Sequence, residues 1–137
     1  MLELQPLRGL GPLLFDMTPA QVRAAFPEPE MYEEWMGGNL NDSILFRGLI
    51  CGFDKCDASG PLPRSKLREF RVSVARSDLS FEGRPLREWN KGTLSALPAL
   101  ADAQPAGAPS ISIRELGLAF DFDEGGHVAF AELWRPE

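Results

Sequence analysis

The sequence predicts an α+β fold, in which helices pack on one face of an antiparallel sheet. Three observations lead to this prediction. Residues 67–74 alternate apolar and polar side chains, as a strand with one wet face does. Thr18 begins a well-marked helix, and residues 116–134 read as a β-hairpin. A chain of 137 residues, 44% of them hydrophobic, suits one domain spanning 1–137 with a single core.

The chain is organised around residues 13–26, a short apolar strand that runs straight into a helix. Residues 1–12 are expected to be an irregular lead-in, because glycine and proline interrupt any regular element there. Thr18 can serve as the N-cap, and Pro19 fills the first helical position, where no donor is needed. Gln21 stands three residues after the cap and completes a capping box.

The same helix start carries a predicted hydrophobic staple. Met17 and Val22 stand at the two staple positions and would fix the angle at which the strand enters the helix. Pro27 ends the helix, because proline cannot continue it. So short a helix is stable only when one side of it packs on the rest of the protein.

An acidic and aromatic segment, residues 27–39, follows this helix. Met31, Trp35 and Met36 fall on one face of a helical stretch that a Gly-Gly pair ends. The glutamates then face water, as in many amphipathic helices. A second interpretation is that aromatic side chains among carboxylates anchor a basic protein surface. The candidate protein-binding residues on that interpretation are Glu30, Tyr32, Glu33, Glu34 and Trp35.

The middle of the chain alternates between strand and loop patterns. Residues 44–54 are rich in β-branched and aromatic side chains and read as one strand, bent at Gly48. Residues 80–86 read as a short strand and a turn. Residues 94–101 have helical spacing with a proline inside it, and residues 104–109 read as a loop.

The last part of the chain predicts a β-hairpin. Residues 116–122 alternate apolar and polar side chains, residues 123–126 suit a tight reversal, and residues 127–134 pair back. Three alanines are assigned to the second face of this hairpin, and their small size suggests that a helix lies close against that side. They are Ala119, Ala129 and Ala131.

Two stretches of the chain share a pattern at the same spacing. Residues 48–54 and 117–123 both begin with Gly-Leu and end with Phe-Asp. A turn and a second strand follow each stretch, and a helical stretch precedes each. We therefore expect two pseudo-repeated units of a helix and a β-hairpin, at about 13–75 and 79–134. The alternative is that two hairpins share these pairs by chance, since strands reuse few residue types.

The charge balance argues against several partners and sites. Twenty acidic residues against 14 basic ones give a net charge of -6, so we expect no electrostatic binding to nucleic acid or to an anionic membrane.

No stretch approaches the roughly 18 apolar residues of a membrane span, and the first residues do not read as a secretory signal. Cys51 and Cys56 have no second pair to complete a zinc site. We expect no metal, reduced thiols and a cytoplasmic location.

No catalytic residue and no cofactor are predicted. The single histidine, His127, lies at the turn of the closing hairpin, where an exposed residue is more common than a general base. The carboxylates of Asp121, Asp123 and Glu124 cluster at the same tip, where turn chemistry explains them. The glycine pairs of the chain lack the lysine and the following helix of a phosphate-binding loop.

Residues 11–23 read Gly-Pro-Leu-Leu-Phe-Asp-Met-Thr-Pro-Ala-Gln-Val-Arg. They resemble the G-x-L-x-F-G-M-T-x-x-x-V-R opening of small bacterial proteins that include the immunity proteins of polymorphic toxin systems. The Met-Thr-x-x-x-Val core is also similar to SmpA/OmlA lipoproteins and to the repeated unit of β-lactamase-inhibitor proteins. Residues 117–123 and the strand after them look like the closing hairpin of the immunity-like group. Asp16 stands where that group usually has glycine, and the lipid-attachment cysteine of the lipoproteins is missing. The resemblance implies a fold more than an activity, because the motif is a strand-to-helix cap.

The leading functional hypothesis is a cytoplasmic immunity or inhibitor protein that binds and neutralises a cognate toxin or effector with a basic surface. Its glutamates would speed association, and its aromatic side chains would slow dissociation. One alternative is a small enzyme or ligand-binding domain that uses carboxylates on the sheet face. Another is an assembly or adaptor subunit of an envelope or secretion system, which would show a broad apolar patch.

Overall fold

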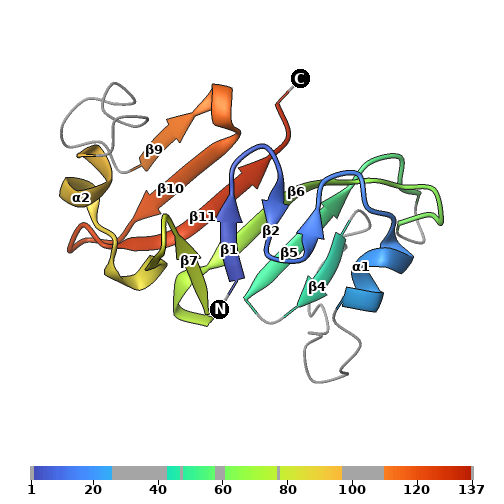
Figure 1. The fold of residues 1–137 in the computed structure, drawn as a ribbon, viewed down its shortest axis with the longest axis horizontal. Helices are drawn as coiled ribbons and strands as arrows, with labels where there is room; N and C mark the ends of the chain where they lie inside the picture. The colour runs from blue at the N-terminus through green and yellow to red at the C-terminus, as the bar shows by residue number, and fades with distance from the viewer. Residues whose placement is uncertain are drawn as a thin grey trace.

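A computed structural model describes residues 2–25, 43–46, 48–57, 61–76, 78–96 and 110–136. Its largest element is a six-stranded sheet, the large sheet, with strand order β4-β5-β6-β11-β10-β9 (Figure 1). In that order the strands are Ser43–Phe46, Leu49–Phe53, Leu67–Ser73, Val128–Trp134, Leu118–Phe122 and Ser110–Ile113. Every neighbouring pair of these strands is antiparallel.

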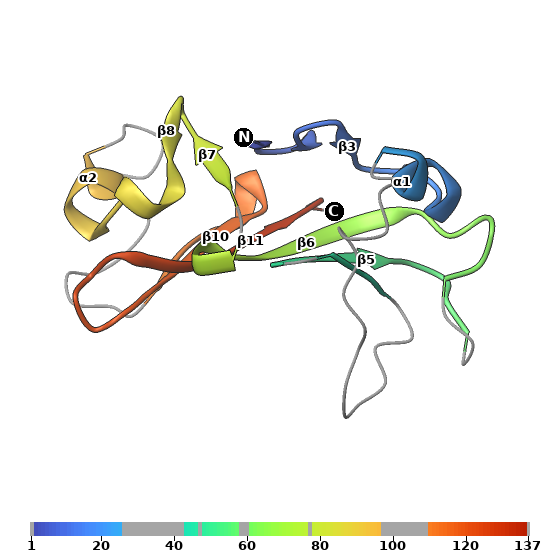
Figure 2. The ribbon, with the colours of Figure 1, turned by 90° about the horizontal axis from the view of Figure 1, so that it is seen from below.

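A second sheet, the small sheet, lies across one face of the large sheet (Figure 2). Its strand order is β3-β2-β1-β7-β8, in which the β1–β7 pair is parallel and the other pairs are antiparallel. In that order the strands are Leu13–Leu14, Gly9–Leu10, Leu2–Gln5, Leu79–Phe81 and Arg84–Pro85. Helices α1 (Pro19–Ala25) and α2 (Lys91–Ser95) lie on the same side of the large sheet as the small sheet.

The hydrophobic core lies between the two sheets. The ring centroid of Phe15 is 5.5 Å from that of Phe70 on β6, and the centroid of Phe81 on β7 is 5.4 Å from that of Phe120 on β10. All four side chains are buried. The predicted combination of helices with a mainly antiparallel sheet is confirmed. Strands outweigh helices because a second sheet, which the sequence did not reveal, covers much of the large sheet.

The lead-in prediction for residues 1–12 is wrong. This region forms β1 and β2, which pair with each other, and β1 also pairs with β7 far along the chain. Leu4 and Leu10 are buried there. Gly9 has φ +153, and an added Cβ would lie 2.0 Å from the carbonyl oxygen of Leu13, so this glycine permits the close approach of β2 to β3 rather than breaking a strand.

The single bent strand predicted at 44–54 is two strands. Strands β4 and β5 form a hairpin in which Phe46 pairs with Leu49. Gly48 has φ +72, a left-handed conformation that closes the tight turn between them. Gly48 was therefore recognised as the special position, but it reverses the chain instead of bending it.

Several local predictions are confirmed. Helix α1 begins at Pro19, and the Thr18 backbone N–H donates to Gln21 Oε1 at 2.9 Å, as a capping box requires. The predicted strand and turn at 80–86 are β7, β8 and the two positive-φ residues between them, Glu82 and Gly83. Val22 is buried and Met17 is half-buried against the core, while the staple contact itself stays a prediction.

The helix predicted at 94–101 begins earlier, at Lys91. Asn90 caps it, because the Asn90 side chain accepts from the Thr93 backbone N–H and the Thr93 hydroxyl accepts from the Asn90 backbone N–H. Apolar spacing alone places the start of this helix too late, because the cap at Asn90 is polar. Residues 97–109, including the predicted loop, lie outside the described residues.

The closing hairpin is confirmed as β10 and β11, but the face assigned to its alanines is corrected. Ala131 pairs with Phe120 and is fully buried in the core, whereas Ala119 and Ala129 are half-buried. A β-bulge between Asp121 and Phe122 shifts the pairing register, so alternation counted along the sequence fails across β11. Neither described helix lies on the second face of the hairpin.

Candidate functional site

The loop between β3 and α1 docks onto the start of β6. The Asp16 backbone N–H donates to the Leu67 carbonyl at 3.0 Å, and the Leu67 N–H donates to the Met17 carbonyl at 2.8 Å. Asp16 has φ +73. Aspartate tolerates this left-handed conformation better than most residues do.

Alternating charges form a chain beside this loop. Arg68 Nε lies 3.1 Å from Asp54 Oδ2, and Arg68 Nη1 lies 3.1 Å from Asp16 Oδ1. Asp16 Oδ2 forms a further ion pair with Arg135 Nη1. These four side chains, the charge chain, therefore join the end of β5, the start of β6, the loop before α1 and the residue after β11. Because these side chains are partly exposed to water, each pair adds little stability by itself.

Hydrogen bonding shifts the pKa of Asp54. The backbone N–H of Lys66 donates to Asp54 Oδ1 at 2.8 Å and is the main reason that the pKa of this carboxyl lies below its usual range. Arg68 lowers the pKa further by hydrogen bonding and by its charge. Asp54 therefore stays ionised at neutral pH, which makes it a poor proton donor.

An open cavity of about 810 Å³ adjoins the charge chain. Its lining consists of Asp16, Asp54, Lys66, Arg68, Glu69, Trp134, Arg135 and Pro136. Asp16 and Asp54 are already held by arginines. Four of the six charged side chains in this lining are thus paired with one another, an arrangement that ties segments together and leaves these two acids without a free charge for a substrate.

The face of the large sheet that points away from the small sheet, the outer face, is different in character. No described helix or strand lies on that side in Figure 2. Cross-strand register places Arg71 opposite Glu132, with 3.9 Å between Arg71 Nε and Glu132 Oε1. Phe130 is 53% exposed, which is unusual for a large apolar side chain in a strand. Strand alternation and pairing place on this outer face, besides glycine and serines, the described residues Ile50, Glu69, Arg71, Ala119, Asp121, Phe130, Glu132 and Trp134.

The residues predicted to bind a protein, Glu30, Tyr32, Glu33, Glu34 and Trp35, all lie outside the described residues. The outer face nevertheless has the same composition, with three carboxylates against one arginine beside two aromatic rings. Sequence reasoning missed it because β6 and β11, which supply most of it, are separated by more than fifty residues of chain. The alternation that places Glu69 and Arg71 on the solvent side of their strand was the signal in the sequence that pointed to this face.

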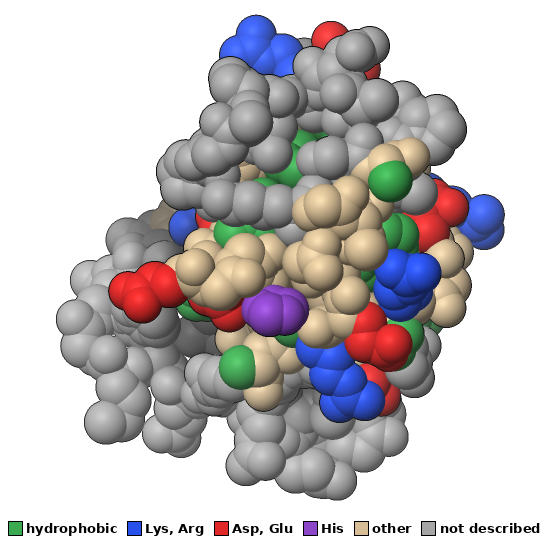
Figure 3. All heavy atoms as spheres, turned by 90° about the vertical axis from the view of Figure 1, so that its left-hand side faces the viewer, with side chains coloured by type: hydrophobic (Ala, Val, Ile, Leu, Met, Phe, Trp, Pro, Cys, Tyr) green, Lys and Arg blue, Asp and Glu red, His purple; other side chains and the backbone are tan. Residues whose placement is uncertain are grey.

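His127 lies at the opposite end of the large sheet from the charge chain. Figure 3 faces this end and shows the histidine at the surface, and the His127 side chain is 60% exposed. Asp123 Oδ1 accepts from the Gly125 N–H at 2.9 Å and from the His127 N–H at 3.0 Å. This confirms that turn chemistry explains the Asp123 carboxylate and that the histidine is exposed. The same explanation is wrong for Asp121, which lies within β10 and pairs with Phe130.

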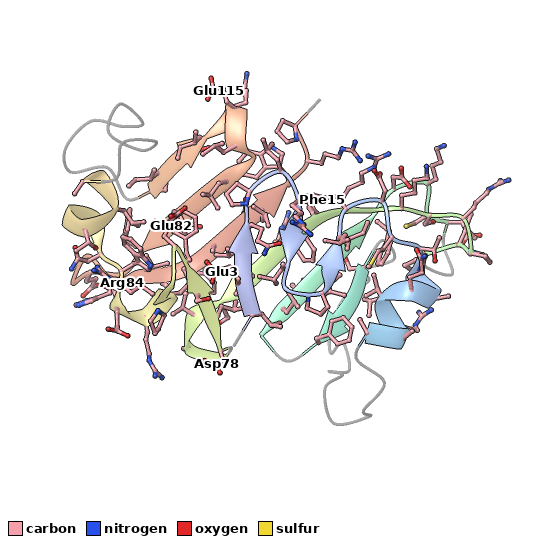
Figure 4. All side chains as sticks on the ribbon, viewed as in Figure 1. Glu3, Phe15, Asp78, Glu82, Arg84 and Glu115 are labelled. Carbon is pink, nitrogen blue, oxygen red and sulfur yellow. The ribbon has the colours of Figure 1, made fainter. Side chains whose placement is uncertain are left out.

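Glu3 is a further polar residue that the sequence did not single out. It lies on β1 beside β7, with Glu82 and Arg84 nearby on the β7–β8 hairpin (Figure 4). Glu3 Oε2 accepts from the Ser80 hydroxyl, and Glu3 Oε1 accepts from the Gly83 N–H at 3.2 Å. Arg84 lies over the Trp89 ring, 4.7 Å from its centroid. These contacts hold the small sheet together, which is a structural role.

Within the part of the chain that the structure describes, no group of three or more His, Cys, Asp or Glu side chains is arranged to hold a metal ion. The described helices are too short or too polar to cross a membrane. Comparisons with family models, with curated proteins and with solved structures found no match.

Proposed function

We propose that this protein is an immunity or inhibitor protein that binds a cognate toxin or effector through the outer face of the large sheet. The observation that carries this proposal is the exposure of Phe130 among carboxylates on a sheet face that no described helix or strand covers. Exposed aromatic side chains supply binding energy in protein interfaces, and surrounding charges select the partner.

The charge of the outer face favours a basic partner. Glu69, Asp121 and Glu132 stand against the single positive charge of Arg71. The net charge of the whole chain, -6, has the same sign and would speed the approach of a basic protein. The proposed setting is the cytoplasm of a bacterium, where such a partner would be neutralised before it acts.

A repeated architecture is part of the proposal. Strands β4-β5-β6 and β9-β10-β11 are each an antiparallel set of three, and β6 pairs with β11 at the centre of the large sheet. Gly48 and Gly117 both have positive φ just before β5 and β10. Capped helices precede both sets. These correspondences support two pseudo-repeated units at about 13–75 and 79–134, which together build one broad face.

Co-expression tests this function. The product of the reading frame beside this gene is expressed in a bacterial host with and without this chain, and growth is measured. We expect the neighbouring product to arrest growth and the chain to relieve the arrest. A chain carrying Phe130→Asp should relieve it much less, while Leu7→Asp, a change at an exposed residue outside the outer face, should protect fully. A harmless neighbouring product, or an arrest unchanged by the chain, would contradict the proposal.

A further inference from the structure

A small hollow lies on the outer face, above the pairing of the two central strands. Its volume is about 190 Å³, and its lining is Glu69, Phe70, Glu132, Leu133 and Trp134. Leu133 pairs with Phe70, so the backbones of β6 and β11 form its floor. Glu69 pairs with Trp134, while Glu132 stands two residues before Trp134 on the same face. Two carboxylates and an indole ring therefore surround the hollow.

We propose that this hollow receives one lysine or arginine side chain of the partner protein. The inference rests on the proposed function and adds the chemistry of the contact. An aromatic ring attracts a cation over its face, and carboxylates beside the ring supply the opposite charge and the hydrogen-bond acceptors. Neutral or acidic side chains would gain neither the attraction of the ring for a cation nor the attraction between opposite charges.

The carboxylates of the hollow retain unused binding capacity. Glu69 forms no ion pair with another described residue, and Glu132 is held only loosely by Arg71 at 3.9 Å. In the neighbouring larger cavity, by contrast, Asp16 and Asp54 are already paired with arginines at close range. Glu69 and Trp134 line both spaces, but the larger cavity also holds the cations Lys66, Arg68 and Arg135, whereas the hollow adds the carboxylate of Glu132. An incoming cation is therefore favoured at the hollow.

Gly52 keeps the hollow open. It stands opposite Glu69 on β5, and an added Cβ would lie 2.6 Å from Glu69 Cγ. Glu69 thus lies over Gly52, on the side away from β11, and leaves the space between Glu69 and Trp134 unfilled. A side chain at position 52 would push Glu69 back across the β6–β11 pair.

A titration with small probes tests the hollow directly. The indole N–H signal of Trp134, identified by its loss in Trp134→Phe, is followed by NMR as N-acetyl-arginine amide is added to the full chain. We expect a saturable shift with this probe and none with N-acetyl-citrulline amide, which has the same shape without the charge. The double variant Glu69→Gln and Glu132→Gln should weaken binding by roughly three- to tenfold.

Matched variants control for folding and for general charge. Asp121→Asn removes an outer-face carboxylate that does not line the hollow and should leave the affinity for the arginine probe unchanged. Gly52→Ala keeps every charge and should still weaken binding, because Glu69 is displaced. Unchanged thermal melting of each variant establishes that the fold is intact. Equal affinity for the arginine and citrulline probes, or equal affinity of the wild type and the double variant, would overturn the inference.

The two proposals fail in different ways. If the double variant protects cells as well as the wild type does in the co-expression assay, the hollow does not hold a partner cation and the inference is overturned, while the function survives. If the arginine probe binds as expected but the neighbouring product is harmless, the cationic chemistry of the hollow is supported and the proposed function is wrong.

Discussion

The two ends of the large sheet share a backbone arrangement and differ in side chains. At one end the Asp54 N–H donates to the Lys66 carbonyl at 3.0 Å and the Lys66 N–H donates to Asp54 Oδ1 at 2.8 Å. At the other end the Asp123 N–H donates to the His127 carbonyl at 2.9 Å and the His127 N–H donates to Asp123 Oδ1 at 3.0 Å. An aspartate thus anchors the next strand in both hairpins.

The bulges of the two hairpins also correspond. Arg68 is the extra residue of β6 where its pairing with β5 shifts, and Ala129 is the extra residue of β11 where its pairing with β10 shifts. Arg68 reaches two carboxylates, whereas alanine reaches none. The aspartate-to-strand hydrogen bonds are therefore a structural device common to both ends, and the ion-pair chain is an addition specific to one of them.

The largest loss of stability is expected from a change in the core residues of β5 and β10. Cys51 and Phe120 are the third residues of β5 and β10, and both are fully buried. Phe120→Ala should lower the free energy of unfolding by about 3–5 kcal/mol, because it removes a large buried ring. Cys51→Ala should cost only about 1 kcal/mol. Denaturant unfolding measures both, and equal losses would show that the core is not packed as described.

The next largest losses of stability are expected at the glycines in the turns before β10 and β11. Gly117 has φ +59, and a Cβ there would lie 1.9 Å from the Trp134 carbonyl oxygen. Gly117→Ala should cost about 2–4 kcal/mol, because backbone must move as well as adopt a strained conformation. Gly126 has φ +81 with no atom within 4 Å of an added Cβ, so Gly126→Ala should cost only the strain, about 1 kcal/mol. Similar losses in denaturant unfolding would rule out the close approach at Gly117.

Changes in the charge chain should have a smaller effect on stability. Arg68→Gln should lower the free energy of unfolding by about 1 kcal/mol, because two carboxylates lose their shared partner. Arg71→Gln, which removes only the loose and exposed pair with Glu132, should cost less than about 0.5 kcal/mol. High salt should shrink the Arg68 effect. If the two variants are equally stable, the ion pairs of Arg68 contribute no more stability than an ordinary surface ion pair does.

The smallest effect is a pH dependence at the Asp54 end. The pKa of Asp54 is lowered in the folded protein, so its ionised form stabilises the fold above the unfolded pKa, and this stability is lost as the pH falls through the folded pKa. The loss should be measurable below about pH 4. Thermal melting across that range compares the wild type with Asp54→Asn. The variant should be less stable near neutral pH and less sensitive to acid, and parallel melting curves would refute the linkage.

Local signals predicted the elements whose stabilising contacts are local. The Thr18 cap of α1, the alternation of β6 and the closing hairpin all depend on residues close together in the chain, and all three are confirmed. Strand β1 was missed because its pairing with β7 joins residues more than seventy positions apart. The same reason hid the contacts of Arg68 with Asp16 and of Trp134 with Glu69, which only the assembled sheet brings together. The alternation count failed at Ala131 because nothing in the sequence marked the bulge before it.

The position of β1 has a consequence for how the chain folds as it is made. One edge of β1 pairs with β2, which follows within a few residues, but the other edge pairs with β7, so Leu2 lies beside Leu79. Until that later strand leaves the ribosome, the backbone amides and carbonyls along the second edge of β1 have no partner from β7. An unpaired edge of this kind can capture a strand of another chain. The interval between synthesis of the two strands is thus a period in which this protein exposes an edge that can aggregate, and slow translation between them would lengthen it.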